Sequence, residues 1–171
     1  MVTTRTFSIS KVLVQALENE ARSRGISTSA LMNQTLDRAV RQTWPSEKVF
    51  VTVIPHYMIN GLLGEMSTEG LRKVAESSAK QYKSMASLYG TKRSLESVLE
   101  MMDKITGPYF GWFVYTHSAE GRDHRILLTH TIGKKWSVWL EAYFVTLFME
   151  MLEIPLKSSI TDNGVMLEFR E

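Results

Sequence analysis

The first forty residues constrain the fold more than any other part of the chain. Residues 4–10 (TRTFSIS) alternate polar and apolar side chains, with Phe7 and Ile9 on one side. This alternation predicts a short β-strand. The other side of the strand carries only hydroxyl side chains: Thr4, Thr6 and Ser8. Because a lone strand leaves its backbone unpaired and its apolar face uncovered, we expect it to pair with the same strand of a second copy.

Two amphipathic helices are expected to follow this strand. The first spans about residues 11–24, is capped by Ser10, and has apolar residues at helical spacing: Leu13, Leu17 and Ala21. Gly25 suits the left-handed conformation that ends a helix. Ser27 is expected to cap the second helix, which runs to about Arg41 and turns three apolar residues inward: Leu31, Leu36 and Ala39.

This order of elements, with the segment GISTSALMNQTL at the helix junction, resembles the ribbon-helix-helix family of DNA-binding proteins over about residues 4–42. The resemblance implies that two chains pair their strands into an antiparallel ribbon that enters the major groove of double-stranded DNA. It implies that the bases are read by the polar side of the strand, at Thr4, Thr6 and Ser8. Family strands often present Arg, Lys, Asn or Gln there, whereas this strand offers only short hydroxyls.

The resemblance also implies contacts to DNA phosphates. Free amides at a helix N-terminus attract anions, so phosphates are expected at the start of the second helix, which comprises Ser27, Thr28 and Ser29. Further phosphate contacts are expected from three cations: Arg5, Lys11 and Arg24. Residues 1–44 hold six Lys and Arg against three acidic residues, a net charge of +3, and the remainder carries −1. A positive N-terminal end agrees with a nucleic-acid partner, whose affinity depends largely on phosphate contacts.

The chain of 171 residues has room for this module at 1–44 and one further domain at 47–171, because Pro45 discourages helix at the residue before it. The absence of cysteine excludes disulfides and thiolate metal sites, and fits a cytoplasmic location. The most apolar stretch, 136–152, is interrupted by Glu141 and Glu150 and is too short for a convincing membrane span. We expect a cytoplasmic protein with no membrane contact.

Residues 47–171 predict an α+β domain in which helices cover an antiparallel sheet of about five strands. A strand is expected at Lys48–Ile54, and helices are expected at about 58–65, 67–89, 93–105 and 134–153. Two hairpins complete the domain, one pairing residues 110–117 with 124–131 and the other pairing 156–162 with 165–169 around Asn163 and Gly164. This order of elements is similar to small-molecule sensing domains of the 4-vinyl-reductase kind.

The helix at 134–153 is the most distinctive feature of the second domain, because it has apolar residues on most of its sides. It is either a central helix packed on the sheet or the wall of a pocket or second dimer interface. For the pocket, two lysines would meet an acidic effector at its mouth. The candidate effector pocket comprises Lys134, Lys135, Trp136, Trp139 and Tyr143.

Metal and catalytic chemistry find little support in the sequence. His117 and His124 are expected to be cross-strand neighbours, but a metal site would need a third ligand such as Asp123 or Glu120. No nucleophile elbow and no glycine-rich phosphate loop occurs. We therefore expect no enzyme activity, no cofactor and no bound metal.

The sequence thus predicts a transcriptional regulator that binds operator DNA as a homodimer, whose C-terminal domain senses a small-molecule effector or adds an oligomer contact. Whether dimers pair into tetramers stays open. Two alternatives remain: an antitoxin-type repressor whose C-terminal part binds a partner protein, and a metal-responsive regulator.

Overall fold

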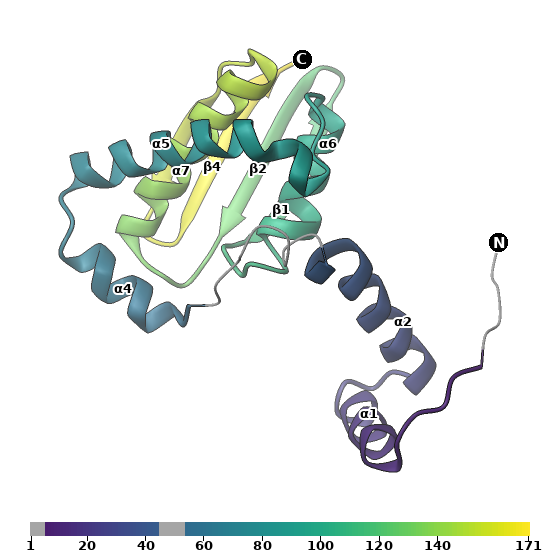
Figure 1. Ribbon diagram of the computed structural model, residues 1–171. Coiled ribbons are helices and arrows are strands. Elements are labelled where there is room, and N and C mark those ends of the chain that lie inside the picture. Colours follow the sequence, from purple (N-terminus) through teal and green to yellow (C-terminus); the bar gives the residue numbers. More distant parts are fainter. Residues whose placement is uncertain (1–5, 45–53) are drawn as a thin grey trace. The chain divides into compact units, whose positions relative to one another are not determined.

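The computed structural model describes residues 6–44 and 54–171 (Figure 1). The chain divides into two compact units, Met1–Glu47 and Lys48–Glu171. The described residues form helices and one four-stranded antiparallel sheet, so the α+β fold class is confirmed. Within these residues, no helix is both long enough and apolar enough to cross a bilayer.

The first unit contains two capped helices. Helix α1 spans Lys11–Ser23, and α2 spans Thr28–Arg38 and continues as a π-helical turn, η1, over Ala39–Thr43. The Ser10 hydroxyl accepts a hydrogen bond from the Leu13 amide at 3.3 Å, and the Ser27 hydroxyl accepts one from the Ala30 amide at 3.1 Å. Gly25 has a φ of +65°. Both predicted N-caps and the left-handed glycine are therefore confirmed.

The strand expected at residues 4–10 is not present in the single chain. Residues 6–10 form no strand, and residues 4 and 5 lie outside the described ranges. Every strand in the described part of the chain belongs to the second unit. A strand exists only where a neighbour accepts its backbone hydrogen bonds, and the ribbon expected from the sequence takes that neighbour from another chain.

The sheet of the second unit consists of two hairpins placed side by side in the order β1-β2-β4-β3. Its strands are β1 (Val114–Glu120), β2 (Asp123–Thr129), β3 (Lys157–Thr161) and β4 (Gly164–Arg170). Both predicted hairpins are confirmed, but the turn between β1 and β2 is tighter than expected and consists of Gly121 and Arg122. Of the strand expected at Lys48–Ile54, only Ile54 is described, and it lies in coil. The described sheet therefore has four strands where about five were expected.

Among the described residues, four α-helices accompany the sheet. They are α4 (His56–Gly64), α5 (Thr68–Met85), α6 (Leu95–Met101) and α7 (Lys134–Leu152). Helix α5 continues as the 3₁₀ turn η2 over Ala86–Tyr89 and ends at Gly90, whereas α6 continues as the π-helical turn η3 over Met102–Thr106.

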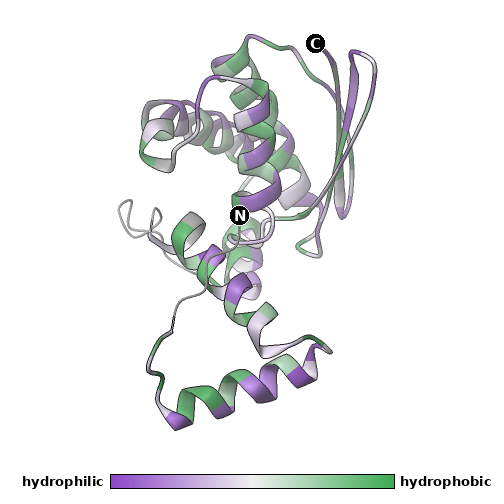
Figure 2. Cartoon of the chain, turned by 90° about the vertical axis from the view of Figure 1, so that its right-hand side faces the viewer, coloured by the Kyte–Doolittle hydropathy of each residue, from purple (hydrophilic) through white to green (hydrophobic). Residues whose placement is uncertain are grey.

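The core of the second unit lies between α7 and one face of the sheet. Leu140, Phe144 and Phe148 of α7 have no exposed surface. Alternate residues of the two central strands are equally buried beneath them: Ile126, Leu128, Val165 and Leu167. Seen from the side, the strands form one layer and the helices of the unit lie on one side of it (Figure 2). The opposite face of the sheet is uncovered among the described elements, and its residues are mostly exposed.

Polar contacts hold α5 and α7 in place on the sheet. Arg72 of α5 donates to a carboxylate oxygen of Glu141 on α7 at 2.6 Å. The other oxygen of Glu141 accepts from the Ser158 hydroxyl of β3 at 2.8 Å. One carboxylate thus links two helices and an edge strand, and fixes the helical layer from which the aromatic residues described below project.

Candidate functional site

The predicted base readers lie in an exposed, extended segment at the start of the first unit. Thr6 and Ser8 are exposed and alternate with Phe7 and Ile9, which are also exposed. Thr4 lies outside the described residues, as does the predicted phosphate contact Arg5. The side chains of this segment therefore alternate between hydroxyl and apolar as expected, but among the described residues no strand pairs with it.

The first unit leaves most of its apolar side chains in solvent. Phe7 is 67% exposed, Val12 82% and Leu13 53%. Leu36, expected to face inward, is also exposed, and only Ala21 and Leu31 are buried in the two α-helices. Between α1 and α2 lies a groove of about 280 Å³, with Leu13, Leu17 and Leu31 among its walls. Two amphipathic helices with so little buried surface do not form a complete core.

The described phosphate contacts that the sequence predicts lie at the starts of α1 and α2 and at the end of α1. Lys11 is exposed in the first turn of α1. Ser27, Thr28 and Ser29 form the start of α2, where the hydroxyl of Ser27 is already used by the cap. Arg24 donates from Nε to Glu20 Oε1 at 2.6 Å, so its charge is partly compensated within α1 and the turn that follows.

In the second unit, three of the five residues of the candidate effector pocket form a continuous aromatic stack. The rings of Trp136 and Trp139 are parallel with centroids 4.8 Å apart, and Tyr143 stacks on Trp139 at 4.9 Å. Trp112, from the segment before β1, meets all three rings edge-on at 5.2 to 6.0 Å. Its carbonyl accepts a hydrogen bond from the Trp136 indole at 2.9 Å.

Two rings of this stack and Trp112 form one wall of a groove of about 360 Å³ whose other wall is α5. The groove is lined by Ser78, Gln81, Tyr82, Met85, Trp112, Trp139 and Tyr143. The structure places neither predicted lysine in this lining. Lys135 donates to the carbonyl oxygens of Gly64 and Met66 at 2.7 and 2.8 Å, and Lys134 lies 3.9 Å from the Asp162 carboxylate. Trp112 and Met85 were missed because contacts between distant segments bring them there: Trp112 from the segment before β1 and Met85 from α5, which packs beside α7.

The two predicted cross-strand histidines do meet. His117 Nε2 and His124 Nδ1 are 3.0 Å apart, and the rings are stacked. Burial, and to a smaller extent the neighbouring His124, lowers the pKa of His117. His124 Nε2 has no hydrogen-bond partner within the described residues, and the nearest carboxylate is Glu171 at 3.6 Å. The lowered pKa favours the neutral form of the His117 ring.

Glu120 and Asp123, named in the sequence as third metal ligands, are paired with each other at the turn and are exposed. Strand alternation turns them away from the face that carries the two histidine rings. In the described ranges, no three His, Cys, Asp or Glu side chains come together in a way that would hold a metal ion.

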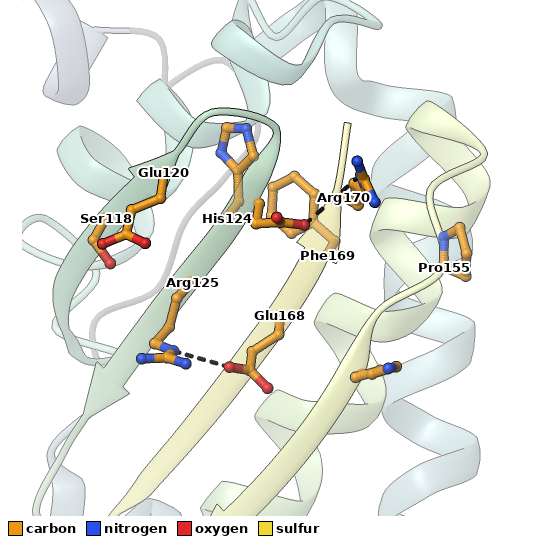
Figure 3. A pocket seen from close by; sticks show the side chains of 10 residues that line it. Ser118, Glu120, His124, Arg125, Pro155, Glu168, Phe169 and Arg170 are labelled. Carbon is orange, nitrogen blue, oxygen red and sulfur yellow. Dashed lines mark hydrogen bonds and ion pairs between the residues drawn. The ribbon is translucent and has the colours of Figure 1, made fainter.

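The uncovered face of the sheet holds a hollow of about 620 Å³ near the β1–β2 turn (Figure 3). Ser118, Arg125 and Glu168 lie in one row across β1, β2 and β4. Arg125 donates to Glu168 at 2.9 Å, and Arg170 lies 3.9 Å from Asp123 in the next row. These charged side chains are between 44% and 74% exposed. Small-ligand pockets are lined mainly by apolar and aromatic side chains, whereas this hollow is lined mainly by charged ones, so it is better suited to a macromolecular surface.

No protein-family model matches this chain, and no curated protein matches it at a significant level.

Proposed function

We propose that the chain is a DNA-binding transcriptional regulator that binds operator DNA as a homodimer through its first unit. In this proposal residues 4–10 of two chains pair as an antiparallel β-ribbon, as in the ribbon-helix-helix family that the segment resembles. The hydroxyl side of the ribbon, with Thr6 and Ser8, reads base edges in the major groove.

The observation that carries the proposal is the uncovered apolar surface of the first unit. Phe7, Val12 and Leu13 are each more than half exposed although they lie on a strand-like segment and a strongly amphipathic helix. Burying one such side chain contributes about 1.5 to 3 kcal/mol. A second copy can bury this surface, because in a symmetric dimer the same apolar residues of both chains meet across a two-fold axis.

The start of α2 supports the contact to DNA. Ser27 caps this helix, so its first amides are ordered and directed outward from the helix end. The net charge of +3 over residues 1–44 doubles in a dimer. Thr28 and Ser29 would then contact the DNA backbone from both chains, while Lys11 and Arg24 add cations.

For the second unit we propose the binding of a small-molecule effector in the aromatic groove between α5 and α7. Its volume of about 360 Å³ lies within the range of small-ligand pockets. The aromatic faces of Trp112, Trp139 and Tyr143 offer apolar contact, and Ser78 and Gln81 offer hydrogen-bonding groups on the opposite wall. An effector here changes DNA binding only if it binds one arrangement of the two units better than another.

The test of DNA binding is selection of bound fragments from genomic DNA, followed by binding curves on the selected operator and on a scrambled duplex. We expect the double variant Thr6→Ala, Ser8→Ala to lose its preference for the operator while it remains dimeric, because base-edge contacts carry the sequence information. Unchanged operator preference would exclude these two residues as readers.

The matched comparison is Lys11→Ala. Loss of a phosphate contact lowers affinity for both duplexes equally and reduces the slope of log affinity against log salt by about one. If the wild-type chain selects no fragment and binds every duplex with the same weak affinity, the regulator proposal is wrong.

A further inference from the structure

The uncovered face of the sheet is electrically balanced and patterned across its two central strands. The hollow on this face contains three basic side chains, Arg125, Lys157 and Arg170, and three acidic ones, Glu120, Asp123 and Glu168. A surface for nucleic acid needs an excess of positive charge, which this face does not have. A balanced surface favours association with another surface of equally mixed charge.

The strand register places opposite charges directly across from one another on β2 and β4. Arg125 is the register partner of Glu168, and Asp123 is the register partner of Arg170. Leu127 is the partner of Met166 in the row next to the charged ones. All six side chains belong to the alternate set that points away from the buried α7.

This pattern complements itself under one symmetry operation. Two copies are placed with their uncovered sheet faces against each other. A two-fold axis between the two sheets, parallel to the strands and midway between β2 and β4, then places β2 of each copy over β4 of the other. Arg125 then faces the partner's Glu168, Asp123 faces the partner's Arg170, and Leu127 faces the partner's Met166. Each of these contacts occurs twice, as in every interface formed by the same surface on both copies.

We infer that this sheet face is a second self-association surface, on which the occupant is the same face of another copy of the chain. Leu127 and Met166 form its apolar centre, with Val114, which is 68% exposed, at its margin on the edge strand. An axis perpendicular to the strands would also bring opposite charges together, but it would place Leu127 and Met166 beyond the ends of the partner's strands, so the charge pairs and the apolar row together fix the orientation of the two sheets. The inference does not rest on the DNA-binding proposal.

The test uses two full-length charge-reversal variants, Arg125→Glu and Glu168→Arg. Each variant alone places like charges opposite one another across the interface, so self-association through the sheet is expected to weaken by about a hundredfold or more. Mixed together, the two variants face each other with opposite charges in both contacts. We expect native mass spectrometry to show assemblies that contain both variants well above the statistical share.

The mixing experiment separates contacts between chains from the ion pair within one chain. In each variant the pair of residues 125 and 168 is broken within its own sheet, and mixing does not restore it there. The matched control is a second exposed ion pair, Glu69 and Lys73 on α5, reversed singly as Glu69→Lys and Lys73→Glu. These controls are expected to keep the wild-type mass and to mix statistically.

The two proposals fail in different ways. If the first unit does not dimerise, the wild-type assembly is a dimer rather than a tetramer, but each sheet variant still halves its mass. Wild-type masses for both sheet variants, together with statistical mixing, would overturn the sheet interface and leave the dimer of the first unit untouched. The charge-swapped double variant Arg125→Glu, Glu168→Arg keeps its pairs both within and between chains, so it should assemble like the wild type.

Discussion

In the second unit Phe144 and Phe148 have no exposed surface, whereas in the first unit Phe7 and Leu13 are mostly exposed. Both units are built from capped amphipathic elements, so the difference does not come from weaker local signals. It comes from what each apolar face has to pack against. Helix α7 has a sheet beneath it and α5 beside it, while among the described elements α1 packs against α2. The comparison supports the proposal that a second copy of the chain covers the apolar surface of the first unit.

The largest expected effect separates the two units by stability. Replacing Phe148 with alanine removes a fully buried ring from between α7 and the sheet and is expected to cost about 3 to 5 kcal/mol of unfolding free energy in the second unit. Chemical denaturation followed by tryptophan fluorescence measures it. Met149→Ala, at an exposed position next in the helix, should change stability little, and equal losses in both variants would contradict the packing described here.

The second prediction concerns the apolar surface of the first unit. If the proposed dimer covers this ring, Phe7→Ala is expected to weaken dimerisation by about 2 kcal/mol per chain. Sedimentation equilibrium across a range of protein concentrations gives the change. Leu62→Ala on α4, an equally exposed apolar residue of the second unit, serves as the control. Unchanged dimerisation of Phe7→Ala would argue against residues 4–10 as a dimer contact.

A smaller effect is expected from the helix caps. Ser27→Ala removes the hydroxyl that accepts from the Ala30 amide and is expected to cost about 1 kcal/mol. In the first unit, whose own contacts are few, this loss should also reduce DNA affinity. Ser67→Ala removes the equivalent bond to Gly70 in α5 and should destabilise the second unit by a similar amount without changing DNA affinity. Calorimetry and binding curves on both variants distinguish the two cases.

The smallest effect is a pH dependence of the second unit. Burial lowers the pKa of His130 below its ordinary value of 6.5. Its Nδ1 accepts from the Ile132 amide, and its Nε2 lies 2.9 Å from the Ser137 hydroxyl, an arrangement that suits the neutral ring. The unfolded chain therefore binds a proton first, so the contribution of His130 to stability is constant above pH 6.5 and is lost as the pH drops through the lowered pKa.

Substitution tests this assignment. His130→Gln should flatten the fall in stability below pH 6.5, measured by denaturation at a series of pH values. Part of the fall should remain in His130→Gln, because the pKa of His117 is lowered as well. An unchanged profile would assign the acid sensitivity to other groups.

Local signals in the sequence predicted much of the second unit. The hairpin around Asn163, the long helix α5 and the apolar helix α7 follow from turn residues, caps and periodicity, which act over a few residues. The same signals correctly gave Ser10, Ser27 and Gly25 in the first unit. They did not predict that β1 and β2 extend to Glu120 and Asp123. The polar residues at these strand ends lie on the uncovered face of the sheet, and they do not alternate with apolar residues as a half-buried strand would.

Contacts between distant segments were the part that the sequence could not supply. Trp112 joins the aromatic stack only because the segment before β1 passes beside α7, and Lys135 is bound by the carbonyls that end α4. The row of Arg125 and Glu168 depends on which strands are neighbours, and β2 and β4 are neighbours only because the two hairpins lie side by side. The alternation of side chains in each strand predicted which residues share a face, but it did not predict that these two strands are neighbours.

The most direct test of the account is whether residues 6–10 of two chains pair with each other. A dimer prepared from one ¹⁵N-labelled and one ¹³C-labelled chain allows contacts between chains to be observed separately by isotope-filtered NMR. We predict cross-strand contacts between the backbone protons of Phe7 and Ile9 in one chain and the same segment of the other. Random-coil shifts with no contacts between chains, in a sample shown to be dimeric, would contradict the shared ribbon and with it the proposed DNA-reading surface.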